Sequence, residues 1–132
     1  DDIEALKEIF RILKPHGILI LTDSADMKLW SRHDIATHAR ERYTIPKLAS
    51  RLKSAGFKIK KITYFNTILY PLVFIIRKLD NLLNNDKTAV SNIRTANPLL
   101  NFALYSIFAV ESKFLKFCDL PFGVSILAIA EK

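Results

Sequence analysis

Residues 29–44, with the sequence LWSRHDIATHARERYT, gather side chains that can transfer protons and bind charge. The stretch holds two histidines, one aspartate, three arginines and a tyrosine, and it lies between two apolar segments. Histidine titrates near neutral pH, and arginine binds anionic groups through a fork of N–H donors. So many polar groups between segments typical of a hydrophobic core make this stretch the candidate functional site.

The same residues also fit two other interpretations. In the first, Asp34 caps a short helix, His38 lies one turn later on the same face, and the arginines are solvated. In the second, Asp34 and His38 at i, i+4 bind a metal together with the nearby His33. His33 lies off that helical face and no further ligands are evident. We therefore predict no metal site.

The composition is that of one small globular domain. The chain has 132 residues, of which 50% are hydrophobic and 25% charged, with only 3 glycines. The net charge of +7 attracts anions of any kind. The lysines at 58, 60 and 61 belong to no recognisable nucleic-acid motif, so we predict no nucleic-acid partner.

Cysteine usage and hydropathy bear on the location of the protein. The single cysteine, Cys118, excludes an intramolecular disulfide and favours the cytoplasm. No signal peptide opens the chain, and residues 68–76, the longest apolar candidate, end at Arg77, far short of the roughly 20 residues of a spanning helix. We expect a cytoplasmic protein, with a peripheral place at the inner membrane face as the alternative.

The first half of the chain predicts a helix, a buried strand and a second helix. A capping box of Asp1 and Glu4 precedes an apolar stripe, which indicates a helix over 2–13 that ends before Pro15. Residues 18–21, ILIL, are apolar on both faces, as in a strand buried between two helical layers of a parallel sheet. Thr44 as N-cap, with proline in the first turn, predicts a helix over 45–55.

The second half predicts two strands separated by a helical insert. Residues 57–65, FKIKKITYF, alternate until the phase slips at Lys60 and Lys61, which indicates a bulged or edge strand. We expect residues 66–83 to be helical and residues 84–97 to form an exposed loop. Asn97 then caps a helix to about 116. Residues 124–130 are apolar on both sides, which predicts a central strand.

These elements and their motifs resemble the C-terminal half of class I S-adenosylmethionine-dependent methyltransferases. The phrase RILKPHG, residues 11–17, is similar to the RVLKPGG that precedes the fifth strand of that family, with His16 in place of glycine. A branch of the family matches at five further motifs. In this chain they are Trp30-Ser31-Arg32-His33-Asp34, Arg42-Tyr43-Thr44, Ala55-Gly56-Phe57, Tyr64-Phe65-Asn66 and Pro121-Phe122-Gly123-Val124-Ser125.

The resemblance implies a partial Rossmann-like α/β fold over 1–132. It consists of a three-stranded sheet fragment with helices, a helical insert at about 66–117, and a last strand that runs antiparallel between the other two. The N-terminal half, which binds the cofactor S-adenosylmethionine, would be absent, so these residues alone would be inactive. Of the cofactor-binding groups, only Asp1 and Asp2 correspond to residues of this chain.

By the same resemblance, residues 22–43 form the acceptor side of a methyltransferase. His33 would be the general base, with Asp34 orienting an imidazole and Arg42 holding an anionic substrate. The residues implied to line the acceptor pocket are Trp30, His33, Asp34, His38, Arg42 and Tyr43. The acceptor would be a small molecule or a lipid- or glycan-type compound.

Two further expectations concern partners. The insert, rich in apolar residues, either covers the pocket or rests on a membrane with Arg77 and Lys78 at the headgroups. The alternative function is therefore a non-enzymatic module that binds a membrane surface or a partner. An unpaired outer edge of the first strand predicts self-association through residues 17–22.

Overall fold

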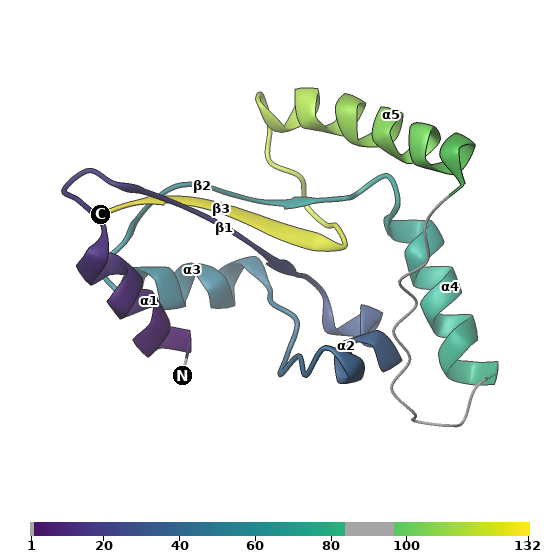
Figure 1. Cartoon of the computed structure of the whole chain (residues 1–132), viewed down its shortest axis with the longest axis horizontal. Coiled ribbons are helices and arrows are strands. Elements are labelled where there is room, and N and C mark those ends of the chain that lie inside the picture. Colours follow the sequence, from purple (N-terminus) through teal and green to yellow (C-terminus); the bar gives the residue numbers. More distant parts are fainter. Residues whose placement is uncertain (1, 84–96) are drawn as a thin grey trace.

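A computed structural model describes residues 2–83 and 97–132 of the chain. Within them, one sheet of three strands carries helices on both sides (Figure 1). The elements in chain order are α1 (Asp2–Ile12), β1 (Ile18–Ser24), the 3₁₀ turn η1 (Met27–Leu29), α2 (Arg32–Ala36), α3 (Ile45–Ser54), β2 (Lys58–Phe65), α4 (Tyr70–Leu83), α5 (Pro98–Leu115) and β3 (Ser125–Glu131).

The sheet has the order β1-β3-β2, and β3 is antiparallel to both neighbours. β1 and β2 therefore run in the same direction on either side of the last strand. This confirms the predicted central, antiparallel position of the last strand. Since β1 and β2 each pair with β3 and with no other strand, both are edge strands among the described residues, and Tyr64 of β2 also forms an isolated bridge with Leu120.

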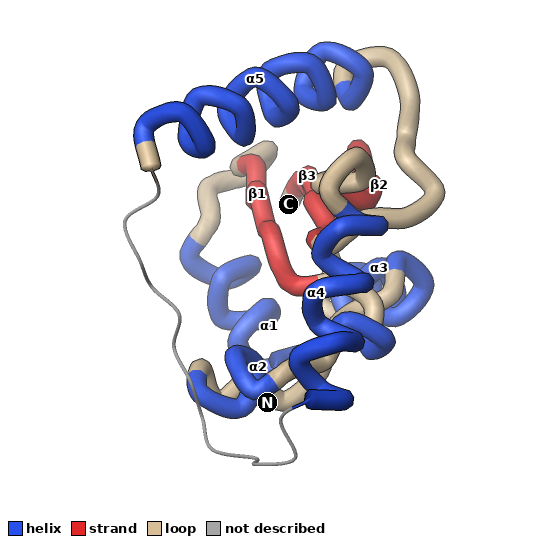
Figure 2. The backbone as a smooth tube through the Cα atoms, turned by 90° about the vertical axis from the view of Figure 1, so that its right-hand side faces the viewer, coloured by secondary structure: helices blue, strands red, loops and turns tan. Residues whose placement is uncertain are grey.

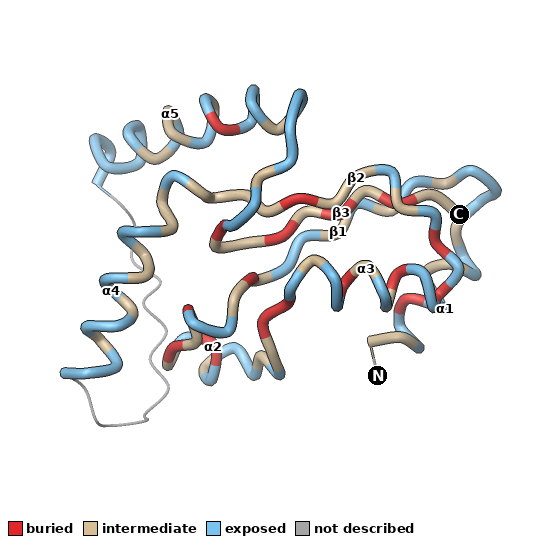
Figure 3. Tube along the Cα trace, turned by 180° about the vertical axis from the view of Figure 1, so that it is seen from behind, coloured by how far each residue is buried: buried red, intermediate tan, exposed pale blue. Residues whose placement is uncertain are grey.

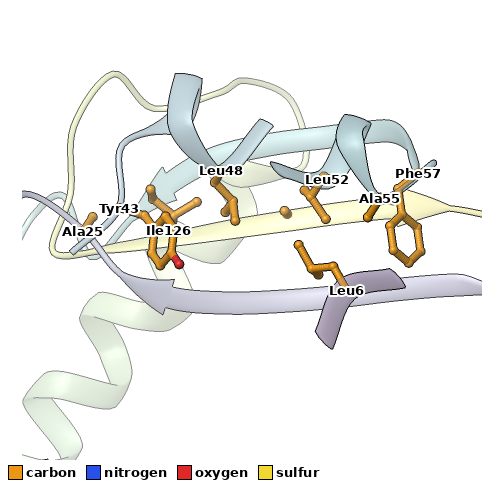
Figure 4. Close-up of a cluster of buried hydrophobic side chains, with 10 residues drawn as sticks. Leu6, Ala25, Tyr43, Leu48, Leu52, Ala55, Phe57 and Ile126 are labelled. Atoms are coloured by element: carbon orange, nitrogen blue, oxygen red, sulfur yellow. The ribbon is translucent and has the colours of Figure 1, made fainter. Parts of the chain in front are cut away.

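Helices α1 and α3 lie on the side of the sheet opposite α5 (Figure 2), and the hydrophobic core lies between them and the sheet (Figure 4). Leu52 of α3 and Ile126 of β3 are completely buried there, and burying such a side chain contributes about 1.5–3 kcal/mol. The rings of Phe10 and Phe57 meet edge to face with centroids 5.1 Å apart at the far end of this layer. Thr44 is the N-cap of α3 with Pro46 in its first turn, as predicted.

The prediction that residues 18–21 are buried between two helical layers is wrong. Leu19 and Leu21 pack on the core, but Ile18 and Ile20 point to the other face and are 50% and 67% exposed. The described helices that pack on β1 cover one face only, and β1 is an edge strand (Figure 3). Apolar residues on both faces of a strand therefore did not indicate two covering layers here.

Glu131 of β3 contacts both the turn before β1 and the β-bulge in β2. His16 adopts a left-handed conformation with φ 61° in the turn before β1, at the position where the resembling family has glycine, which takes that conformation without steric cost. Its Nδ1 lies 2.9 Å from one carboxylate oxygen of Glu131, and Lys60 Nζ lies 2.5 Å from the other. Lys60 is the extra residue of a β-bulge between Ile59 and Lys61, which confirms the predicted phase slip.

Helix α4 of the insert has charged side chains facing the rest of the protein and apolar side chains facing solvent, the reverse of most surface helices. Arg77 and Asp80 of α4 turn toward the rest of the protein, while large apolar side chains of the same helix are exposed. The exposed apolar residues of α4 are Leu72, Ile75, Ile76, Leu79, Leu82 and Leu83. The helices begin at Tyr70 and Pro98, later than predicted for the first and as predicted for the second. Most of the predicted loop, 84–96, and Asp1 lie outside the described residues.

Neither of these two helices, nor any other in residues 2–83 and 97–132, combines the length and the apolar character required to cross a membrane.

The Glu131 contacts make stability depend on pH. Hydrogen bonds from Lys60 and His16 lower the pKa of Glu131 from 4.5 to about 2. A carboxylate with a lowered folded-state pKa contributes stability above its unfolded pKa and loses it as the pH falls through the folded one. We expect Glu131→Gln to destabilise the protein at pH 7, with the difference from the parent shrinking between pH 4.5 and 2. Urea unfolding at both pH limits measures this, with Glu4→Gln as the control; a constant difference would contradict it.

The exposed edge of β1 predicts self-association of the chain. A strand edge offers unpaired N–H and C=O groups to another chain, and a charge placed on the edge discourages that pairing. We expect Ile20→Lys to reduce association in sedimentation velocity at high concentration. Ile12→Lys, at a comparably exposed position of α1, should leave it unchanged. A parent chain that stays monomeric at high concentration would remove the basis of this expectation.

Candidate functional site

The carboxylate of Asp34 is buried in a cluster of hydrogen bonds. It accepts from the Ser31 amide at 2.8 Å and the Ser31 hydroxyl at 3.0 Å, which forms a capping box at the start of α2. The Arg42 guanidinium binds it in a fork, with Nε donating to Oδ1 at 2.9 Å and Nη2 donating to Oδ2 at 3.1 Å. Nη1 of Arg77 lies 3.1 Å from Oδ2.

These contacts make Asp34 a fixed negative charge. Burial by itself raises the pKa of this carboxyl, but the hydrogen bonds from Arg42 and Ser31 outweigh it, and the pKa lies below its usual value. The group therefore stays ionised at neutral pH. Among the described residues, the Asp34 carboxylate accepts hydrogen bonds from two arginines and from Ser31 and not from an imidazole, contrary to the expected role of orienting a histidine.

Arg77 carries the cluster into the insert. The same Nη1 donates to the carbonyl of Leu29 at 2.7 Å, so α4 is fixed to the turn η1. Two neighbouring contacts repeat the link: Arg32 binds Asp80 at 2.8 Å, and Asn81 donates to the Trp30 carbonyl at 3.0 Å. Arg42 and Trp30, predicted to bind substrate, both take part in this attachment.

The structure places the two histidines of the stretch at the surface. His33 lies on α2 and is exposed, and neither histidine borders the hollows described below. His38 lies beyond Thr37, the C-cap of α2, and has a left-handed φ of 55°. The predicted placement of His38 on one helical face with Asp34 is therefore wrong, because α2 ends first. Residues 2–83 and 97–132 contain no group of three histidine, cysteine or acidic residues arranged to hold a metal.

Tyr43 lies beside Arg42 in the chain but belongs to a second polar cluster. Its hydroxyl donates to the carboxylate of Asp2 and accepts from Arg51, whose guanidinium also lies over the Tyr43 ring, 4.9 Å from its centroid. Arg51 also binds Glu41 at 2.7 Å. Burial and the bond to Asp2 raise the pKa of the Tyr43 phenol far above its usual value, so it stays protonated.

Three hollows surround the carboxyl end of β1, and Asp23 borders all of them. One is a cavity of about 250 Å³ between α1, β1 and α3, with the phenol of Tyr43 and the carboxylate of Asp2 in its wall. Another, of about 340 Å³, lies where β1, β2 and β3 meet, next to Ser24 and Phe65. Ligands of open α/β sheets bind at the carboxyl ends of the strands, which makes this the candidate site.

Asp23 is the ionisable group most suited to chemistry here. Burial first, and then the nearby charge of Asp2, raise the pKa of its carboxyl above the usual value. One oxygen accepts from the Ser24 amide at 2.6 Å. Neither Asp23 nor Arg51 was singled out from the sequence. The signal that could have pointed to Asp23 is its position shortly after the four apolar residues 18–21, near the carboxyl end of the strand that they predict.

No protein family, curated protein or solved structure matches this chain.

The Asp34 cluster predicts a large effect of removing its charge. Asp34→Asn keeps the shape but leaves the buried Arg42 without its partner and next to the half-buried Arg77, and breaking one partner of a buried ion pair costs about 3–5 kcal/mol. Urea unfolding measures the loss. Glu8→Gln, which removes the solvent-exposed partner of Arg11, should change little by comparison.

Arg77→Gln provides a second measurement if the Asp34→Asn variant does not fold. It keeps the Asp34–Arg42 fork, so the loss should concentrate in α4. We expect faster amide hydrogen exchange in Tyr70–Leu83 than in α1 and α3. Equal protection of all three helices would show that Arg77 does not hold the insert.

Proposed function

We propose that this chain is the acceptor-side part of an S-adenosylmethionine-dependent methyltransferase with a Rossmann-like fold. The observation that carries the proposal is the group of hollows at the carboxyl end of β1, bordered by Asp2, Asp23 and Tyr43. The sheet order β1-β3-β2 supports it, since the motif resemblance implies a last strand that runs antiparallel between the other two. Residues outside this sequence would bind most of the cofactor.

The polar and apolar side chains that line the cavity suit parts of the cofactor. S-Adenosylmethionine supplies a methyl group on a positively charged sulfonium, together with ribose hydroxyls and an adenine. The carboxylates of Asp2 and Asp23 suit a nearby positive charge or hydroxyl donors, and Leu6 and Leu21 offer apolar surface in the same wall. At about 250 Å³ this cavity is smaller than the roughly 300–1,000 Å³ of most ligand sites. These residues would therefore hold only part of the cofactor.

The residues of this chain would position the reacting groups and would supply one proton acceptor. Methyl transfer depends strongly on aligning the reacting atoms, so rigid walls matter more than ionisable groups. Arg51 clamps Tyr43 and Asp2 in place. Where the acceptor must lose a proton, Asp23 borders the hollows and has a raised pKa, whereas His33 borders none of them, which favours Asp23 as the general base.

The test is a calorimetric titration of S-adenosylhomocysteine. It is made into this chain and into the complete product of its gene. We expect binding by the complete product and little or none by the 132 residues alone. In the complete product, Asp23→Asn should weaken binding about tenfold or more, because a hydrogen bond to a charged group contributes about 1.5–3 kcal/mol.

Asp119→Asn is the matched control. This acid is exposed and pairs with Lys61 at 2.7 Å, and it borders none of the three hollows. Its neutralisation changes the net charge by the same amount and should leave the affinity unchanged. A complete product that binds no S-adenosylhomocysteine would reject the methyltransferase proposal and favour the non-enzymatic module.

A further inference from the structure

Helix α5 presents apolar side chains to solvent over most of its length. Its body-facing stripe consists of Leu104, Ile107, Glu111 and Leu115, at helical spacing. The opposite side holds aromatic rings as exposed as Phe102 at 68% and Tyr105 at 69%. The exposed large apolar residues of the helix, called here the α5 surface, are Leu99, Leu100, Phe102, Tyr105, Phe108, Val110 and Phe114.

The only acid between residues 97 and 118 is turned away from this surface. Glu111 is 4% exposed, and its carboxylate accepts from the amides of Thr67 at 3.1 Å and Ile68 at 3.3 Å. The basic residues of the same segment, Lys113 and Lys116, are both exposed. The exposed residues of α5 therefore combine large apolar side chains with positive charge only.

We propose that the α5 surface docks on a lipid bilayer that carries anionic headgroups. A helix that lies in the membrane interface needs exposed aromatic and aliphatic residues to enter the acyl boundary and basic residues to reach the headgroups. Lysine reaches the headgroups by extending its long stem along apolar surface. Tyr105 suits the interface because its ring is apolar and its hydroxyl polar.

Charge favours a bilayer over a second copy of the chain. An association of two α5 surfaces brings Lys113 and Lys116 of both copies together, and no exposed carboxylate of this helix neutralises them. Anionic headgroups supply that negative charge. The inference is independent of methyl transfer, since α5 borders none of the hollows around Asp23.

The experiment is co-sedimentation of the chain with vesicles of phosphatidylcholine, with and without phosphatidylglycerol. We expect binding to the anionic vesicles that weakens as salt rises. Lys113→Gln with Lys116→Gln should weaken it about 10- to 30-fold, since each basic residue near an anionic surface contributes about fivefold. Phe102→Asn with Phe114→Asn should weaken it at least about tenfold.

Matched controls distinguish binding through the α5 surface from binding caused by the overall charge or hydropathy of the protein. Lys7→Gln with Lys53→Gln removes two exposed lysines from α1 and α3, and Ile20→Asn removes a comparably exposed apolar side chain from β1. Both should bind vesicles like the parent. Circular dichroism confirms that each variant is folded.

Three results would overturn the proposal. One is no binding to anionic vesicles at low salt. Another is equal loss in the control variants, which would mean general attraction of a basic protein to the vesicles. The third is binding by the 132 residues that disappears in the complete gene product, which would show that another part of the protein covers the α5 surface.

Discussion

The charge of Asp34 is the constraint on which the placement of α2, Arg42 and the insert helix α4 depends. A carboxylate that is 3% exposed needs partners, and it finds them in the backbone of its own helix start, in Arg42 and in Arg77. Through these bonds one side chain fixes α2, the segment that leads to α3, and the insert helix α4. An uncompensated buried charge is so costly that these segments cannot separate independently.

Arg42 and Tyr43 show how one stretch divides into two roles. Successive residues of an extended segment point to opposite sides. Arg42 enters the Asp34 cluster, and Tyr43 turns toward Asp2 and the cavity under β1. Part of the polar stretch that first suggested a catalytic site therefore holds the fold together, and the groups suited to ligand binding lie at the end of the preceding strand.

The insert is attached by polar contacts, and that explains its outward face. Tyr70 donates to Asp26 at 2.5 Å, Arg77 binds the Asp34 cluster, and Glu111 accepts from the backbone at the start of the insert. Most helices attach by burying an apolar stripe. Here hydrogen bonds and ion pairs take much of that role, so leucine, isoleucine and phenylalanine side chains are left at the surface. An apolar face of this size is typical of an interaction site.

Local structure could be predicted from the sequence alone. Caps at Thr44 and Asn97, the phase slip at Lys60 and the spacing of apolar residues located the helices and strands, because each signal involves residues within one or two turns or along one strand. The central place of the last strand was predicted from its apolar residues on both sides, whereas its antiparallel direction was implied by the family resemblance. The left-handed turn at His16 was foreseeable only through its glycine counterpart in the resembling family.

Contacts between side chains that are far apart in the sequence were decided only by the tertiary structure. Asp34 and Arg77 are 43 residues apart, and nothing in the intervening sequence indicates that they pair. Whether a second layer covers Ile18 and Ile20 depends on where helices pack, not on the strand itself. The raised pKa of Asp23 comes from partial desolvation and from the charge of Asp2, and its place beside three hollows comes from the packing of α1 and α3 around the end of β1. A residue's chemistry follows its surroundings, and those are set by long-range packing.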